Sequence, residues 1–332
     1  MNSFERYCGM VKGDKVDFVP RIPILMHFAA RYSGKKYSQY ASDYRVMADC
    51  KCKLVEDFDF EQLDVMCDPW RETTAFGGKI KYFEDSVPSC SHPLENTRNL
   101  DLLAPPDPDS SQRMNDAIKA IGLYKAFGWK KYSITGWVEG PAAMSANLRG
   151  VAGFMLDLMD DEAYTCQLMD ICTEVAIKFA VSQIAAGADT IGVGDAIASQ
   201  ISPDLYERLV APREKRLFEA IHNAGGFVRL HICGNINKLL GSISNLGIDI
   251  IDCDWMVDME AARRILGTRV ALAGNLDPVK SVMNSDPQTI KSQIMEIYKK
   301  VDNPFFVNAG CEIPVGTPHE NLRALCESVL AM

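Results

Sequence analysis

Short apolar runs alternate with long helical patterns along this chain, and the alternation constrains the fold more than any other feature. Eight runs rich in β-branched residues predict β-strands. Most of these runs are apolar throughout, which is typical of parallel strands that are buried on both faces. The predicted strands cover residues 21–25, 62–66, 131–138, 189–194, 227–232, 249–254, 270–273 and 305–308.

The order strand then helix, repeated eight times, predicts a (β/α)8 TIM barrel. The helical patterns also have recognisable ends. Gly187 follows one of them as a C-terminal cap, and Ser202-Pro203 begins another with an N-cap serine and a proline in the first turn. Because no linker or low-complexity tract interrupts the chain, we expect a single domain over residues 1–332.

One segment between the second and third predicted strands departs from this order. Gly77-Gly78 separates two β-rich runs, at 73–76 and 79–83, and such a pair predicts a hairpin turn. Long loops that follow barrel strands commonly cover the active site. We therefore expect an inserted hairpin over the mouth of the barrel.

Charge and composition exclude several classes of function. The net charge is −9 and the chain has no run of lysine or arginine, so nucleic acid is not an expected partner. No apolar run reaches membrane-spanning length, and the first residues have no apolar stretch typical of a secretory signal. The odd number of cysteines, eleven, favours reduced thiols and a cytoplasmic location.

Two predicted strand ends carry residues with metal-binding side chains. His231 and Cys233 lie at the end of one strand, and Cys311 follows the last strand. Residues i and i+2 of a strand share a face, so His231 and Cys233 can reach one ion together. Imidazole and thiolate are ligands that Zn²⁺ prefers, and three protein ligands leave the open position of a catalytic site. The alternative is a buried histidine with two inert core cysteines.

Further polar residues fall at other predicted strand ends, where TIM barrels place their active sites. Asp68, Glu139, Asp195 and Asp254 are the candidates for catalytic, substrate-contact or fourth-ligand roles, and Asn275 is a candidate for cofactor binding. A water or a substrate thiol could also take the fourth position. Each carboxylate has a simpler alternative, such as starting the turn before Pro69 for Asp68 or capping the next helix for Asp195.

At this point the chain resembles the uroporphyrinogen decarboxylase superfamily over nearly its whole length. The resemblance rests on Arg21-Ile22-Pro23, Cys67-Asp68-Pro69, His231-Ile232-Cys233-Gly234, Gly274-Asn275-Leu276-Asp277-Pro278 and residues 308–321. It implies a (β/α)8 barrel, in agreement with the strand count. Asp68 matches the active-site aspartate of the decarboxylases.

The decarboxylase branch itself matches less well. Its paired-arginine signature for substrate carboxylates is reduced here to Arg31, which is also expected to take part in cofactor binding, and Cys311 stands where those enzymes have histidine. The zinc-dependent corrinoid methyltransferases resemble this chain in His231, Cys233 and Cys311.

This resemblance implies a zinc methyltransferase that moves a methyl group between a corrinoid protein and a small thiol, methoxy compound or methylamine. Zn²⁺ would be the bound metal, and the partner protein would supply the corrinoid (a methylcobamide). A homodimer is a further expectation. Three alternatives remain open: a decarboxylase of a porphyrinogen-like acid, a methyl-tetrahydrofolate-linked methyltransferase, and a non-catalytic barrel that binds a corrinoid protein.

Overall fold

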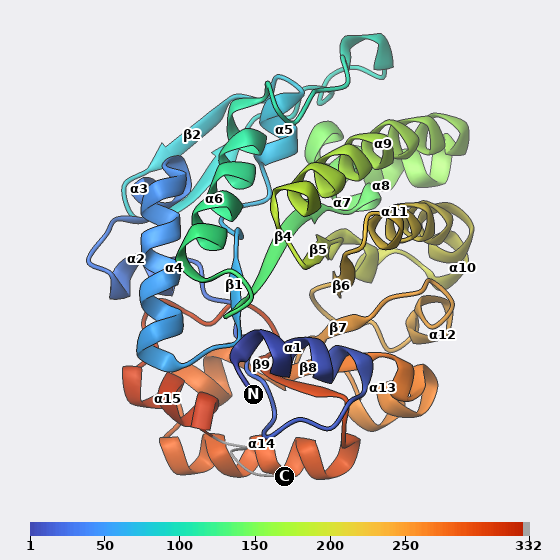
Figure 1. Ribbon diagram of the computed structural model, residues 1–332. Helices are drawn as coiled ribbons and strands as arrows, with labels where there is room; N and C mark the ends of the chain where they lie inside the picture. Colours follow the sequence, from blue (N-terminus) through green and yellow to red (C-terminus); the bar gives the residue numbers. More distant parts are fainter. Residues whose placement is uncertain (328–332) are drawn as a thin grey trace.

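Seven parallel strands form one curved sheet at the centre of the molecule (Figure 1). The computed structural model describes residues 1–327. Seven of the eight predicted strands are confirmed, mostly with slightly different ends. In spatial order they are β1 (Gln62–Asp64), β4 (Ser133–Glu139), β5 (Thr190–Gly194), β6 (Phe227–His231), β7 (Ile250–Cys253), β8 (Ala271–Leu276) and β9 (Phe305–Ala309).

Helices follow the strands along the chain and pack around the outside of the sheet (Figure 1). This is the arrangement of a (β/α)8 TIM barrel, as predicted. None of the helices within residues 1–327 has the length and apolar character needed to cross a membrane. The helices are α1 (Ser3–Lys12), α2 (His27–Tyr32), α3 (Tyr37–Ser42), α4 (Tyr44–Phe58), α5 (Arg71–Ala75), α6 (Gln112–Gly128), α7 (Pro141–Arg149), α8 (Val151–Asp160), α9 (Glu162–Ala186), α10 (Pro203–Leu205), α11 (Ala211–Asn223), α12 (Leu240–Ile243), α13 (Met259–Leu266), α14 (Pro287–Val301) and α15 (His319–Glu327).

The strand predicted at 21–25 is wrong, although its segment does occupy the gap between β9 and β1. Only Arg21 forms a bridge, to Val307 of β9. The Ile22 amide donates to the Val307 carbonyl at 3.0 Å, and the Glu61 amide before β1 donates to the Arg21 carbonyl at 3.2 Å. Proline at positions 20 and 23 has no N–H to donate. The segment therefore closes the barrel without extending into a regular strand.

The inserted hairpin is confirmed, but its predicted turn is wrong. The antiparallel pair consists of β2 (Ile80–Phe83) and β3 (Ser86–Cys90), so the turn lies at Glu84 and Asp85. Gly77 and Gly78 instead follow helix α5, where Gly77 has a positive φ of 95°. The tip of the hairpin is attached to the barrel because the Tyr37 amide donates to Asp85 Oδ1 at 3.1 Å.

The register of the sheet sets the geometry of the barrel mouth. Glu139, Gly194, His231 and Asp252 are paired in sequence from β4 to β7, so they form one row across four strands. Paired residues in a sheet point to the same face. Since neighbouring strands are about 4.8 Å apart, the row brings His231 beside Asp252 and places Glu139 about 10 Å from His231 along the sheet.

Candidate metal centre

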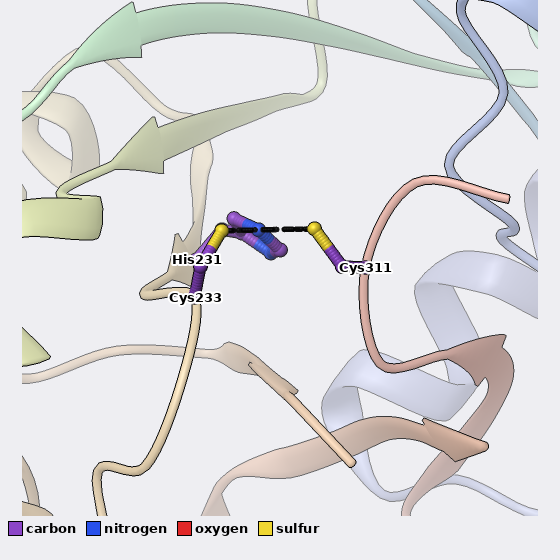
Figure 2. A group of neighbouring side chains, drawn as sticks. All are labelled: His231, Cys233 and Cys311. Atoms are coloured by element: carbon purple, nitrogen blue, oxygen red, sulfur yellow. Dashed lines mark hydrogen bonds between the residues drawn. The ribbon is translucent and has the colours of Figure 1, made fainter. Parts of the chain in front are cut away.

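His231, Cys233 and Cys311 converge at the mouth of the barrel (Figure 2). His231 ends β6, Cys233 lies two residues later, and Cys311 lies two residues beyond β9. His231 Nε2 is 3.1 Å from Cys233 Sγ and 3.8 Å from Cys311 Sγ, and the two sulfur atoms are 3.6 Å apart. The predicted ligand set therefore forms from two segments that are distant in sequence.

These distances fit one tetrahedral zinc ion. With bonds of about 2.3 Å to sulfur and 2.05 Å to nitrogen, tetrahedral geometry requires about 3.8 Å between sulfurs and about 3.6 Å between nitrogen and sulfur. The three separations lie within about half an ångström of these values. A metal site needs a group of at least three histidine, cysteine or carboxylate side chains. Among the described residues, His231, Cys233 and Cys311 form such a group. Its three members leave a fourth position open.

Asp252 and Arg229 hold the imidazole of His231 in place. His231 Nδ1 lies 3.2 Å from Asp252 Oδ2, which leaves Nε2 facing the sulfurs. Arg229 donates to both Asp252 oxygens at 2.8 Å, and both side chains are fully buried. Burial opposes ionisation of Asp252, but Arg229 and His231 outweigh it and lower its pKa to about 2. A carboxylate on the second ring nitrogen is the usual partner of a metal-binding histidine.

The prediction from sequence did not include Asp252 and Arg229, although a signal was present. Arg229 lies among the apolar residues Phe227, Val228 and Leu230 of strand β6, and a buried guanidinium requires a carboxylate partner. Residues 229 and 231 share a face, so that partner had to lie beside His231 on a neighbouring strand.

The two cysteines have opposite shifts in acidity. Hydrogen bonds with Cys233 and His231 outweigh burial and lower the pKa of Cys311 to about 4. The hydrogen bond with Cys311, together with burial, raises the pKa of Cys233. The cluster thus favours a thiolate at Cys311 near neutral pH, and a thiolate is the form that binds metal.

Two glycines allow the ligand loops to approach each other. Gly234, directly after Cys233, has a φ of 92°, and its amide donates to Asp254 Oδ2 at 2.7 Å. Only glycine adopts this backbone conformation without strain. A Cβ atom on Gly310, directly before Cys311, would collide with the backbone of Asp254 and Trp255.

Two adjoining cavities meet at Cys233. The first has a volume of about 210 Å³, and its lining residues are Ile24, Met26, Met66, Cys67, Asp68, Pro69, Trp137, Glu139, Gly194, Ala196, His231, Cys233, Cys311 and Glu312. The second has a volume of about 510 Å³, and its lining residues are Pro69, Glu139, Ala143, Ala146, Asn147, Val151, Ala196, Ile197, Ser199, Gln200, Cys233, Gly234, Asp254 and Met256.

Asp68 lines the first cavity, as the prediction of an active-site role requires, but its oxygens are already bonded. Arg113 of α6 donates to Oδ1 at 3.0 Å and to Oδ2 at 2.6 Å, and the Trp70 amide donates to Oδ1 at 3.0 Å. Burial opposes ionisation, but Arg113 outweighs it and lowers the pKa of Asp68. Arg113 was not predicted from the sequence, because it lies in a helix 45 residues further along the chain and no local pattern connects it to Asp68.

Glu139 lines both cavities beside a second carboxyl group that the sequence did not reveal. The Glu139 amide donates to Glu72 Oε1 at 2.9 Å, and Trp137 Nε1 donates to Glu139 Oε1 at 3.2 Å. Burial and the neighbouring Glu72 raise the pKa of Glu139 well above its usual value. Glu139 is therefore a cavity carboxyl group that resists ionisation.

Asp195 is buried behind the site and lines neither cavity. Its oxygens accept from the amides of Ala142 at 3.2 Å and Ala143 at 2.6 Å, at the start of α7. Its own amide donates to the His231 carbonyl at 2.9 Å. Burial raises the pKa of Asp195 to about 7. Asp195 thus caps the start of α7, an earlier helix of the chain, and not the next one, and its backbone amide supports the end of strand β6.

Asp254, Asn275 and Arg31 lie outside the cluster of metal-binding atoms. Asp254 lines the second cavity, where its Oδ1 is buried without a hydrogen-bond partner among the described residues. Asn275 holds the loop after β7, because its Nδ2 donates to the carbonyls of Asp254 and Val257 at 3.2 and 2.9 Å. The Arg31 side chain is 65% exposed and lies 3.7 Å from Asp85 of the hairpin, so it lines neither cavity.

Comparison with known proteins places this geometry in context. The family model described as uroporphyrinogen decarboxylase (URO-D) matches residues 2–332. The methylcobamide:CoM methyltransferase MtbA of Methanosarcina mazei is 28% identical over 272 residues, which are 81% of this chain and 79% of that protein. The uroporphyrinogen decarboxylase of Solibacter usitatus is 26% identical over 321 residues, which are 92% of this chain and 91% of that protein.

A solved structure of a methyltransferase from Methanosarcina mazei has the same fold. It superimposes with a TM-score of 0.90 at 24% identity and covers 99% of this chain and 98% of that one. At this identity the likeness concerns the fold alone.

Proposed function

The chain belongs to the uroporphyrinogen decarboxylase family, and we propose that within it the protein is a zinc-dependent methyltransferase. It would move a methyl group between a corrinoid carried by a partner protein and a small thiol, methoxy compound or methylamine. The observation that carries the proposal is the convergence of His231, Cys233 and Cys311 beside a cavity, at separations that fit one tetrahedral zinc ion.

Sequence identity alone does not separate the two activities in the family. The methyltransferase and decarboxylase relatives are 28% and 26% identical to this chain. The ligand set favours the methyltransferase, because catalysis by a zinc-activated thiolate requires soft ligands with an open position. A porphyrinogen carries several carboxylates, and neither cavity has a lysine or arginine among its lining residues.

Some residues of the site would bind the metal, and others orient the residues that bind it. His231, Cys233 and Cys311 would bind Zn²⁺, and Asp252 fixes Nε2 of His231 as the binding nitrogen. Bound zinc supplies Lewis acidity, which keeps a substrate thiol deprotonated or polarises a methoxy oxygen. Two thiolates and a neutral imidazole balance the charge of the ion, so electron density stays on a substrate sulfur.

The corrinoid would arrive on a partner protein. The two adjoining cavities, of about 210 and 510 Å³, are of the size that encloses a drug-sized ligand, roughly 300–1,000 Å³, and a corrin is larger than such a ligand. The methyl-bearing face would therefore approach over the mouth, where Trp255 and Met256 expose apolar surface near the second cavity. The methylcobamide named in the methyltransferase relatives supports this assignment.

Metal analysis of three proteins tests the proposal. Wild type, Cys311→Ser and a control, Cys166→Ser on helix α9, are purified without oxygen and their zinc content is measured. We expect about one equivalent of zinc in wild type and control and less than about half in Cys311→Ser, because a hydroxyl is a poor zinc ligand. Circular dichroism should show the same fold in all three.

Methyl transfer from methylcobalamin to a thiol is then measured on the same samples. The control should match wild type, and Cys311→Ser should lose activity. Wild type with little zinc, or Cys311→Ser with a full equivalent, contradicts the metal assignment.

A further inference from the structure

Apart from the three candidate metal ligands and Cys67, the ionisable side chains that line the two cavities are all carboxyl groups. Asp68, Glu139 and Glu312 line the first cavity, and Glu139 and Asp254 line the second. Among the described residues that line either cavity there is no lysine or arginine. The rest of the first wall is largely apolar and includes Met26, Met66 and Trp137. The walls thus offer no positive charge beside the proposed metal.

Two positive groups close to this region, Arg113 and Arg229, are already neutralised by the protein's own carboxylates. Both terminal nitrogens of Arg113 bind Asp68, at 3.0 and 2.6 Å. Arg229 binds both oxygens of Asp252 behind His231. A carboxylate held on two guanidinium nitrogens is among the stronger hydrogen-bonded pairs in proteins, so a substrate anion would have to displace it.

The start of helix α7, beside the second cavity, is occupied as well. Helix N-termini attract anions, because their first amide groups lack partners within the helix. At the start of α7 the amides of Ala142 and Ala143 donate to Asp195. Asp195 is completely buried, so no solute can replace it there without unpacking the barrel.

From these contacts we propose that the small substrate carries no anionic group, so that the part of it that does not react is neutral or cationic. The inference rests on the proposed function, and it narrows the substrate class of that same site. An anionic tail would be buried among carboxyl groups without a counter-ion, which is strongly unfavourable. Coenzyme M, a two-carbon thiol with a sulfonate, has such a tail. A hydroxyl or ammonium tail can hydrogen-bond Glu139, and an ammonium can also approach the Trp137 ring.

Three thiols that differ only in the tail test this inference. They are 2-mercaptoethanesulfonate, 2-mercaptoethanol and 2-mercaptoethylamine, titrated calorimetrically into zinc-loaded wild-type protein and also used as acceptors from methylcobalamin. We expect the sulfonate to bind about tenfold more weakly than either of the others, because its charge has no partner in the cavity.

A variant with an added charge removes the effect of differing thiol acidity. Ala196 is exposed and lines both cavities, so Ala196→Lys places a cation there, and Ala196→Met is its uncharged control. Binding of the sulfonate should strengthen about tenfold in Ala196→Lys relative to Ala196→Met. Binding of 2-mercaptoethanol should be the same in the two variants.

The outcomes separate this inference from the proposed function. Methyl transfer that proceeds but prefers the sulfonate overturns the inference and leaves the methyltransferase standing. Binding in the expected order without methyl transfer overturns a thiol as the methyl acceptor of the proposed function and supports the inference. If none of the three thiols binds the zinc-loaded protein, both the inference and the proposal of a thiol substrate are overturned.

Discussion

The two sides of the barrel mouth treat buried charge in opposite ways. On the ligand side, formed by His231, Cys233, Cys311 and Asp252, the carboxylate is bonded by Arg229 and faces the histidine. On the acid side, Glu72 and Glu139 lie together, and the groups that hydrogen-bond them are the Glu139 amide and the Trp137 indole.

This difference separates a rigid part of the site from a responsive one. A guanidinium that bonds both oxygens of a carboxylate fixes the position of both groups. A pair of carboxyl groups without a cation changes its charge when the pH or a bound molecule changes, because burial and mutual repulsion resist ionisation. The ligand side is therefore suited to hold a metal, and the acid side to respond to what enters the cavity.

Removing the cation from the ligand side should have the largest effect. Arg229→Met leaves Asp252 buried and charged without its main partner, so we expect a loss of about 3–5 kcal/mol in the free energy of unfolding. Urea denaturation of the zinc-loaded proteins measures it. The double variant Arg229→Met/Asp252→Asn should recover part of the loss, because the unpaired charge is gone. If Arg229→Met lowers the free energy of unfolding by less than about 1 kcal/mol, the ion pair with Arg229 is not what stabilises the buried Asp252 carboxylate.

Removing only the Asp252 charge that orients His231 should lower the affinity for zinc, with a smaller free-energy change than the loss of Arg229. For Asp252→Asn we expect a ten- to hundredfold loss of zinc affinity, roughly 1.4–2.7 kcal/mol, measured by competition with a chelator. Asp249→Asn is the matched control, since Asp249 contacts His222 at 2.8 Å at the opposite end of β7. Equal zinc affinity in the two variants would show that Asp252 does not tune the ligand.

The acid side should reveal itself as a modest pH dependence. Burial and Glu72 raise the pKa of Glu139 above the value of about 4.3 expected in the unfolded chain. Stability from the protonated group is then fully present at low pH and declines as the pH rises above that value. Glu139→Gln should remove the decline and gain on the order of 1 kcal/mol over wild type at pH 8, but little at pH 4.

Urea denaturation at several pH values measures this effect. Glu84→Gln is the control, because Glu84 has an 80% exposed side chain at the hairpin tip and should follow wild type. If the free energy of unfolding varies with pH in the same way in wild type and Glu139→Gln, the acid side does not respond to pH and does not differ from the ligand side in this respect.

The sequence by itself predicted the order of the strands along the chain and the three candidate metal ligands. Strand periodicity is local, and it also places His231 and Cys233 on one face, so neither prediction depended on distant contacts. The same local reasoning failed at 21–25, because two prolines prevent a regular ladder, and at Gly77-Gly78, which follows a short helix.

Only the tertiary structure decided how the buried charges are paired. Strand register sets His231 beside Asp252, and helix packing brings Arg113 to Asp68 across 45 residues. The tertiary structure also places Asp195 at the start of α7 and leaves Arg31 exposed beside the hairpin. Each pairing depends on where two distant segments meet, and no local pattern encodes that. The charge of the cavity, and hence the substrate class we propose, is therefore a property of the folded chain.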